Sequence, residues 1–146
     1  MKELIYIAGP LFTPGERWLN SRLALTIAEY AEKAGKEVEV YLPQEQAEGS
    51  TASVFQRNLR ALERARVVVA VLDGPDVDSG TAWEIGYAFA KGIPVVGVRF
   101  DFRQSGEDGS VNLMIRHSLT GRLIRANGQK TQPVWQLVVK RVLELL

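Results

Sequence analysis

The feature that most constrains the fold is an uninterrupted apolar run from Val67 to Leu72, dominated by β-branched valines. Side chains of a strand point alternately to its two faces, so a strand that is apolar throughout has both faces buried. Such burial is typical of the central strands of a parallel sheet that carries helices on each side. The run therefore predicts an α/β protein.

Strand-like and helix-like patterns alternate along the rest of the chain. Short runs of β-forming residues predict further strands at 4–8, 37–42, 94–98 and 122–126. Helical spacing of apolar residues predicts helices at 17–34, 53–65 with Ser53 as its cap, 81–91 and 133–146. This order predicts right-handed βαβ units and a doubly wound five-stranded parallel sheet, a flavodoxin-like or Rossmann-like three-layer sandwich. We expect one domain, residues 1–146.

Composition excludes several classes of protein. The chain has no cysteine and one histidine, His117, which excludes disulfides, thiolate nucleophiles, cysteine-ligated zinc and multi-histidine metal sites. The formal net charge of +1 argues against a nucleic-acid partner, because such domains usually carry a basic stripe. No apolar stretch reaches membrane-spanning length and the N-terminus has no signal-peptide pattern. We therefore expect a cytoplasmic protein without a membrane partner.

Polar and turn-forming residues follow the predicted strands. In chain order they are Gly9 and Pro10, Gln44, Asp73 and Asp78, and Asp101 and Arg103. Ligands of open α/β sheets bind at the carboxyl ends of the strands, so we expect these residues around one crevice. Tyr6 lies inside the first strand, close to the same edge. The alternative is that Asp and Gly form turns there and nothing more.

Glu84 stands out within a segment of mostly apolar or small residues, 82–89. It follows Asp78-Ser79-Gly80-Thr81, which suits a helix N-terminus, and we expect it in or near the first turn of that helix. There the helix dipole favours a carboxylate by about 0.3–1 kcal/mol. Two interpretations stay open: a half-buried glutamate kept for chemistry, or a solvated one on a narrow polar stripe with Lys91.

Signatures of several other enzyme classes are missing from the sequence. There is no phosphate-binding loop of the G-x-x-x-x-G-K-[ST] type, no G-x-G-x-x-G turn after the first strand and no G-x-S-x-G elbow. Carboxylates remain as the candidate reactive groups, and glycosyl transfer is chemistry that carboxylates perform without a metal or cofactor. We therefore expect no metal and no cofactor.

Four segments, in this order and spacing, resemble the nucleoside 2-deoxyribosyltransferase family: residues 6–12 (YIAGPLF), 71–74 (VLDG), 78–88 (DSGTAWEIGYA) and 112–114 (NLM). The resemblance implies that Glu84 is the nucleophile that attacks C1′ and forms a covalent glutamyl–deoxyribosyl intermediate, with net retention of configuration. It implies that Tyr6 holds this glutamate in place. Asp73 and Asp78 match the aspartates that contact and protonate the departing base, and they could share one proton.

The resemblance also implies a substrate pocket and an assembly. Gln44 matches a base-contacting glutamine, although its loop aligns loosely, and Gly9, Gly80 and Met114 are expected to line the pocket. Asn112 matches an asparagine that reaches the 5′-hydroxyl from a neighbouring subunit, so we expect a homo-oligomer, at least a dimer. The expected partners are deoxynucleosides and free nucleobases.

Two further functions stay open at this point. One is a 2′-deoxynucleoside 5′-monophosphate N-glycosidase, a hydrolase that uses Glu84 with water as the acceptor. Asn112 favours a nucleoside over a nucleotide, whereas Arg103 and Ser79 suit a phosphate. The other is a non-catalytic nucleotide-binding module, because a fold does not determine a function.

Overall fold

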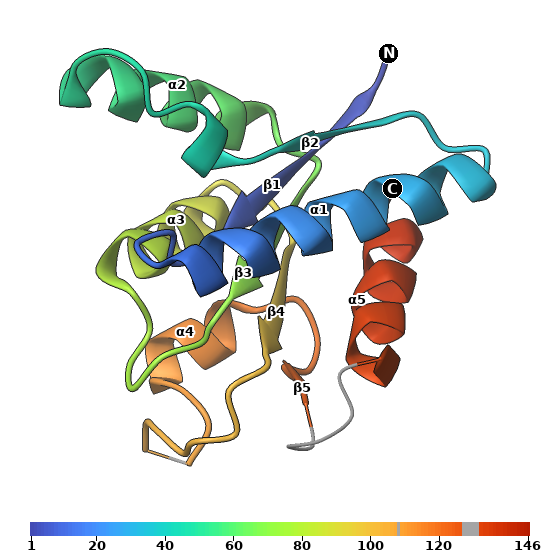
Figure 1. The fold of residues 1–146 in the computed structure, drawn as a ribbon. Coiled ribbons are helices and arrows are strands. Elements are labelled where there is room, and N and C mark those ends of the chain that lie inside the picture. The colour runs from blue at the N-terminus through green and yellow to red at the C-terminus, as the bar shows by residue number, and fades with distance from the viewer. Residues whose placement is uncertain (108, 127–131) are drawn as a thin grey trace.

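The computed structural model describes residues 1–107, 109–126 and 132–146. Its centre is a sheet of five parallel strands in the order β2-β1-β3-β4-β5 (Figure 1). The strands are β1 (Glu3–Ala8), β2 (Val38–Tyr41), β3 (Val67–Val71), β4 (Val95–Arg99) and β5 (Ile124–Arg125). The strand order reverses between β1 and β3, as in flavodoxin-like domains. The predicted doubly wound parallel sheet is therefore confirmed.

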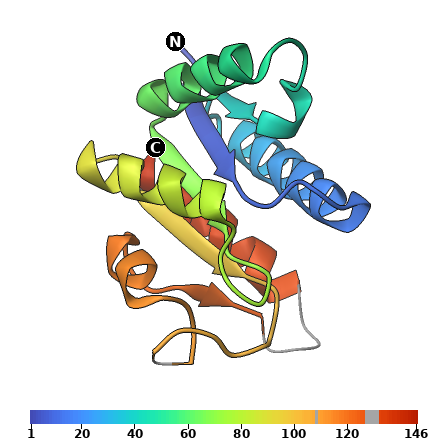
Figure 2. The same ribbon diagram turned by 90° about the vertical axis from the view of Figure 1, so that its left-hand side faces the viewer.

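Helices cover both faces of this sheet. They are α1 (Pro14–Lys33), α2 (Thr51–Arg64), α3 (Ser79–Ala90), α4 (Leu113–Ser118) and α5 (Gln132–Leu145), with a short 3-10 helix, η1 (Pro43–Glu45), after β2. Helices α1 and α5 pack on one face, α2 and α3 on the other, and α4 lies beside α3 (Figures 1 and 2). This arrangement is the predicted three-layer sandwich.

Strand β3 is buried on both faces, as its apolar run predicts. Val67, Val69 and Val71 pack into the core beneath α1 and α5, whereas Val68 and Ala70 pack into the core beneath α2 and α3. Each of these side chains is at most 1% exposed. Full burial of a valine contributes about 1.5–3 kcal/mol, so this strand anchors the two layers of helices to each other.

Some predicted helix boundaries are wrong by a few residues. Ser50, rather than Ser53, caps α2, and its hydroxyl accepts a hydrogen bond from the Ser53 N–H (3.2 Å). Asp78 caps α3, which begins at Ser79. Glu84 therefore lies in the second turn, where the helix dipole acts more weakly than at the terminus. The position of Glu84 therefore has to be explained by the packing of α3 against the sheet.

Arg99, at the end of β4, is completely buried, which the sequence does not suggest. Its guanidinium donates hydrogen bonds to the carbonyl oxygens of Leu72, Gly74 (2.9 Å) and Arg103 (3.1 Å). Gly74 has a φ of +116°, a conformation that side chains other than hydrogen rarely allow. Arg99 thus ties the loop after β3 to the loop after β4.

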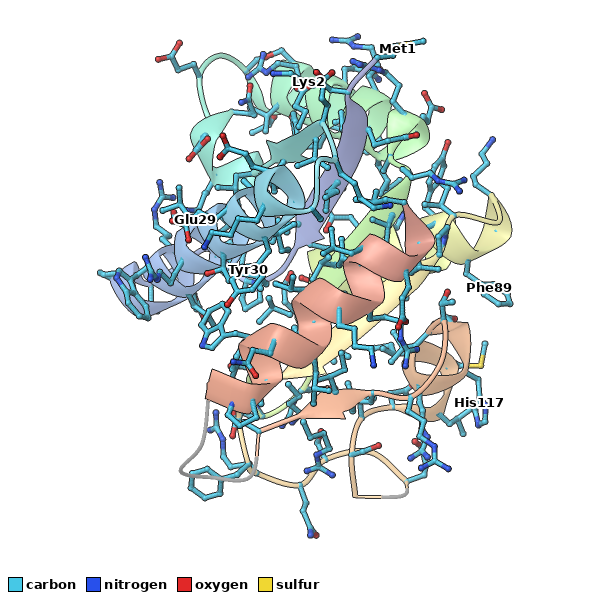
Figure 3. All side chains as sticks on the ribbon, turned by 90° about the vertical axis from the view of Figure 1, so that its right-hand side faces the viewer. Met1, Lys2, Glu29, Tyr30, Phe89 and His117 are labelled. Atoms are coloured by element: carbon cyan, nitrogen blue, oxygen red, sulfur yellow. The ribbon has the colours of Figure 1, made fainter. Side chains whose placement is uncertain are left out.

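The molecular surface carries His117 on α4 and Phe89 on α3, both exposed (Figure 3). Among the residues that the structure describes, no helix is long and apolar enough to cross a membrane. Within the same residues, no group of three or more His, Cys, Asp or Glu side chains is placed to hold a metal ion.

Replacing Arg99 with methionine removes every donor and leaves its carbonyl partners buried without this hydrogen bond. We expect the free energy of unfolding to fall by about 3 kcal/mol, measured by urea denaturation. The matched change at an exposed arginine, Arg66→Met, should alter it by less than about 0.5 kcal/mol. Equal small effects of the two substitutions would show that Arg99 does not hold the loops.

Candidate active site

The centre of the candidate site is a hydrogen bond between two side chains that lie far apart in the sequence. The Tyr6 hydroxyl, from β1, donates to Glu84 Oε1, on α3, at 2.5 Å. Tyr6 is completely buried and Glu84 is half-buried. The second interpretation of Glu84, a solvated residue on a polar stripe, does not fit this position, because its partner is inaccessible to water.

Burial dominates the electrostatics of this pair. It raises the pKa of Glu84 to about 7, against the hydrogen bond from Tyr6, which lowers this pKa, while the nearby charge of Asp78 raises it further. Burial, followed by the charge of Glu84, raises the pKa of Tyr6. Tyr6 therefore stays a hydrogen-bond donor, and Glu84 changes its charge near neutral pH.

Glu84 opens into a cavity of about 280 Å³ between α2 and α3. The lining residues are Tyr6, Phe55, Asn58, Leu59, Leu62, Gly80, Trp83 and Glu84. Sequence reasoning assigned no role to Asn58, yet its Oδ1 accepts a hydrogen bond from the Tyr41 hydroxyl (2.9 Å), and the Tyr41 ring stacks on Tyr6. The helical spacing of Leu59 and Leu62 indicates a buried face of α2, but not which cavity that face would line.

Asp78 and Gly80 lie at the start of α3, next to Glu84. Asp78 Oδ2 accepts hydrogen bonds from the backbone N–H (2.9 Å) and the hydroxyl (3.0 Å) of Thr81. A Cβ at Gly80 would lie 3.2 Å from Asp78 Oδ2, so glycine leaves this carboxylate room to cap the helix. The charge of Asp78 acts on Glu84, while one of the Asp78 carboxylate oxygens is used in the helix cap.

Asp73 lines a second cavity, of about 300 Å³, on the α1 face of the sheet. Its Oδ1 accepts hydrogen bonds from the backbone N–H groups of Phe100 (2.7 Å) and Asp101 (3.2 Å). Burial raises the pKa of Asp73, although these hydrogen bonds lower it. The carboxylate whose charge acts on Asp73 is Asp101, not Asp78, so the structure does not bring the two predicted aspartates together to share a proton.

The pKa of Asp101 is shifted in the opposite direction from that of Asp73. The Arg103 guanidinium donates to both of its oxygens, including an Nε–H bond of 2.8 Å to Oδ2, and lowers the pKa of Asp101 well below its usual range. Neighbouring carboxyl groups with pKa values shifted in opposite directions are typical of acid–base sites. The sequence placed Asp101 at this edge of the sheet but did not pair it with Asp73.

Gln44 and Gly9 lie near the Asp73 cavity without facing Glu84. The Gln44 side chain is buried against α1: its Nε2 donates to the Arg17 carbonyl and to the Ser21 hydroxyl, both at 2.9 Å. It lines neither the Glu84 cavity nor the Asp73 cavity. A Cβ at Gly9 would lie 3.1 Å from both Asn20 Oδ1 and Val71 Cβ, so a side chain there would crowd the end of β1.

Asn112 and Met114 lie outside the Glu84 cavity of their own chain. Asn112 caps α4, with its Oδ1 accepting a hydrogen bond from the Met114 N–H (2.9 Å), and Met114 is 71% exposed. Helix α4 packs against α3, the helix that carries Glu84. The expected role of Asn112 in a neighbouring subunit's site stays a prediction.

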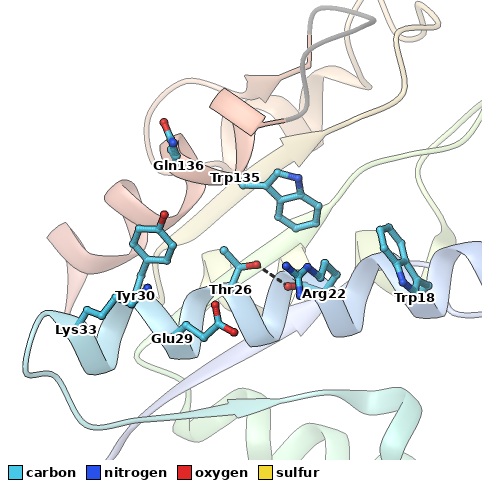
Figure 4. Close-up of a pocket in the computed structure, with 8 residues that line it drawn as sticks. All are labelled: Trp18, Arg22, Thr26, Glu29, Tyr30, Lys33, Trp135 and Gln136. Atoms are coloured by element: carbon cyan, nitrogen blue, oxygen red, sulfur yellow. Dashed lines mark hydrogen bonds between the residues drawn. The ribbon is translucent and has the colours of Figure 1, made fainter.

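A groove between α1 and α5 is lined by neither Glu84 nor Asp73. Figure 4 shows Trp18, Arg22 and Glu29 on α1 and Trp135 on α5 facing this groove, which has a volume of about 280 Å³. Trp18 is 65% exposed and also lines the Asp73 cavity. The Trp18 side chain therefore lines both this groove and the Asp73 cavity.

The fold and the site define a flavodoxin-like α/β protein with two half-buried carboxyl groups, Glu84 on α3 and Asp73 directly after β3. The family model described as nucleoside 2-deoxyribosyltransferase matches residues 5–120, and the chain belongs to this family. No match was found among curated proteins.

Solved structures of similar proteins cover nearly the whole chain. A conserved protein from Enterococcus faecalis V583 is 28% identical with a TM-score of 0.75, covering 97% of this chain and 99% of that one. A 2-desoxiribosyltransferase from Leishmania mexicana is 25% identical (TM-score 0.65, 94% and 97% covered). A 2-deoxyribosyltransferase from Bacillus psychrosaccharolyticus is also 25% identical (TM-score 0.60, 90% and 95% covered).

The raised pKa of Glu84 makes stability depend on pH in a defined direction. Between its ordinary pKa of 4.5 and its folded pKa of about 7, the folded protein keeps a proton that the unfolded chain has lost. This stabilisation is complete below pH 4.5 and is lost as the pH rises through 7, a fall of about 3 kcal/mol.

Urea denaturation across this pH range would measure the effect. The Glu84→Gln variant should lack the decline, and Tyr6→Phe should shift it to higher pH because the hydrogen bond that lowers the pKa is gone. Glu32→Gln, at an exposed position of α1, is the matched control and should leave the profile unchanged. Parallel profiles for the wild type and Glu84→Gln would contradict the burial of this carboxyl group.

Proposed function

We propose that the protein is a nucleoside 2-deoxyribosyltransferase, which moves 2-deoxyribose from one nucleobase to another through a covalent intermediate on Glu84. The observation that carries the proposal is the hydrogen bond from buried Tyr6 to Glu84 at the edge of a cavity. The tyrosine fixes the carboxylate in one orientation and stabilises its charged form, as an attacking nucleophile requires. A Glu84 pKa of about 7 leaves a large fraction ionised at neutral pH.

In the first half-reaction a Glu84 oxygen bonds to C1′ while the C1′–N bond breaks. The bonding electron pair leaves with the base nitrogen, and a proton transferred to the base makes it a neutral leaving group. 2-Deoxyribose lacks the electron-withdrawing 2′-hydroxyl, so positive charge develops readily at C1′ and the carboxylate stabilises it. The products are a free base and a glycosyl ester of Glu84.

Asp73 is the better candidate for the group that donates this proton. Burial raises its pKa, and the charge of Asp101, which its pairing with Arg103 keeps ionised, adds to this rise. Asp78 uses one oxygen to cap α3 and lies beside Glu84, where a negative charge favours the positive charge at C1′. General acid catalysis of this kind contributes about 10²–10⁴-fold.

In the second half-reaction a ring nitrogen of another base attacks C1′ from the face that the first base left, its N–H proton passes to the carboxylate that protonated the first base, and Glu84 departs as a carboxylate. Two inversions at C1′ give net retention of configuration. The residues assigned to these steps are all side chains of the chain itself. The proposal therefore requires neither a metal ion nor a cofactor.

The competing reaction, hydrolysis of a deoxynucleoside 5′-monophosphate, would need hydrogen-bond donors for the phosphate, for which Arg103 and Ser79 were the candidates. Arg103, the arginine that the sequence suggested for this role, is engaged with both oxygens of Asp101. Drawing it to a phosphate would leave the Asp101 charge unpaired. This pairing favours a nucleoside over a nucleotide as the substrate.

Incubation with deoxyinosine and free cytosine, followed by chromatography, tests the reaction. We expect deoxycytidine and hypoxanthine as products, and a mass increase of one 2-deoxyribosyl group on the protein when the acceptor is omitted. Glu84→Ala should retain ligand binding and lose turnover, whereas Glu32→Ala should match the wild type. Free deoxyribose as the only sugar product would mean hydrolysis, and binding without turnover of nucleosides or nucleotides would mean a binding module.

We also propose a homo-oligomer, at least a dimer, in which Asn112 of one subunit completes the Glu84 site of another. Mixing two inactive variants, Glu84→Ala and Asn112→Ala, under conditions of subunit exchange should restore part of the activity, because hybrid assemblies contain sites with both residues intact. The double variant mixed with itself is the control. No recovery despite proven exchange would place both residues in the same subunit's site or remove Asn112 from it.

A further inference from the structure

Asn20, on α1, is a buried polar side chain that the proposed reaction does not use. It is 4% exposed, and its Nδ2 donates hydrogen bonds to the carbonyl oxygen of Pro10 (2.9 Å) and to Gln44 Oε1 (3.2 Å). Its other polar atom, Oδ1, has no hydrogen-bond partner among residues 1–107, 109–126 and 132–146. A buried acceptor without a donor destabilises a protein unless a ligand or solvent satisfies it.

The orientation of the Asn20 amide follows from its neighbours. Exchanging its oxygen and nitrogen would place an acceptor against two other acceptors, the Pro10 carbonyl and Gln44 Oε1. Gln44 is fixed in turn, because its Nε2 donates to the Arg17 carbonyl and to the Ser21 hydroxyl. The unpaired atom of Asn20 is therefore its oxygen, an acceptor that requires an N–H or O–H donor.

Asn20 lines the cavity that also contains Asp73. Gly9 lies next to Asn20 Oδ1, and a Cβ at that position would stand 3.1 Å from the oxygen. Glycine at position 9 avoids this close contact with the oxygen. The cavity has a volume of about 300 Å³, and exposed Trp18 forms part of its wall. An indole, a carboxyl group and an amide oxygen around one space suit a flat heterocycle that carries hydrogen-bond donors.

We propose that Asn20 Oδ1 accepts a hydrogen bond from an N–H group of the nucleobase, and that Asn20 is a specificity-determining residue for bases that carry such a group. This inference rests on the proposed function, in that it takes the Asp73 cavity as the place of the base. The Asp73 carboxyl group then contacts a second polar atom on the same edge of the base. A base without an N–H leaves Asn20 Oδ1 unsatisfied and is bound less well.

Two deoxynucleosides that differ by one amino group provide the test. Deoxyadenosine carries an N–H on its base, whereas purine 2′-deoxyriboside carries none. The ratio of their kcat/KM values, compared between wild type and variant, cancels the difference in leaving-group quality. Asn20→Ala should lower this ratio about tenfold. Deoxycytidine and its analogue without the amino group should behave in the same way.

Two variants separate base recognition from a merely structural role. Asn20→Asp keeps an oxygen at the cavity and loses the Nδ2 donor, so we expect it to preserve the ratio although the network is damaged. Gln44→Ala disrupts the same network without touching the cavity and should lower both kcat/KM values by the same factor. A lower ratio in Gln44→Ala and an unchanged ratio in Asn20→Ala would overturn the proposal.

Binding measured without turnover distinguishes failure of this inference from failure of the proposed function. In the Glu84→Gln background, calorimetry should show that Asn20→Ala weakens deoxyadenosine but not purine 2′-deoxyriboside. If the wild type turns over no nucleoside but this pattern appears, the reaction is wrong and the inference stands. Equal effects on both ligands, or binding of neither, would overturn the inference. If Asn20→Ala does not fold, Asn20→Ser also removes the amide oxygen and should produce the same fall in the ratio.

Discussion

The interaction on which the site depends is the hydrogen bond between Tyr6 and Glu84. Burial pushes the glutamate towards its neutral form, and the tyrosine hydroxyl counteracts this by stabilising the carboxylate. The contact forms because Tyr6 shares its face of β1 with Leu4 and Ala8, beneath α2 and α3. Ile85, next to Glu84, packs into the same core and fixes the rotation of α3. The hydrophobic packing on this face of the sheet therefore positions Tyr6 and Glu84 for their hydrogen bond.

The sheet divides the candidate chemistry between its two faces. Glu84 occupies a cavity on the α2 and α3 side, whereas Asp73 and Asn20 line a cavity on the α1 side. Tyr6 of β1 lines the Glu84 cavity and Val71 of β3 lines the Asp73 cavity, and the strand order reverses between these two strands. Ligands of doubly wound sheets bind at this switch point, because the connections diverge there and leave a crevice. A deoxynucleoside placed across the strand ends would have its sugar and its base on different faces.

Local sequence patterns predicted the strands and helices. They did not predict the hydrogen-bond partners of Gln44 and Arg99, which come from distant segments of the chain. The apolar run of β3 was sufficient to predict the sheet, whereas the pairing of Tyr6 with Glu84 was expected only from the resemblance to a known family. Gln44 was expected at a substrate, yet its amide groups are taken up by α1. No local signal marks Arg99 as buried, since arginines are usually exposed and its partners are carbonyl oxygens of two loops.

Arg99 influences the proposed proton donor, Asp73, through the two loops that it holds together. Because it ties the loop after β3 to the loop after β4, Asp73 and Asp101 are brought close enough for their charges to interact. Burial is the main cause of the raised pKa of Asp73, and the charge of Asp101, which pairs with Arg103, adds to this rise. Two chemically identical side chains thus have their pKa values shifted in opposite directions. The proposed acid, Asp73, therefore depends on how two loops are held together. No motif in the sequence specifies that arrangement.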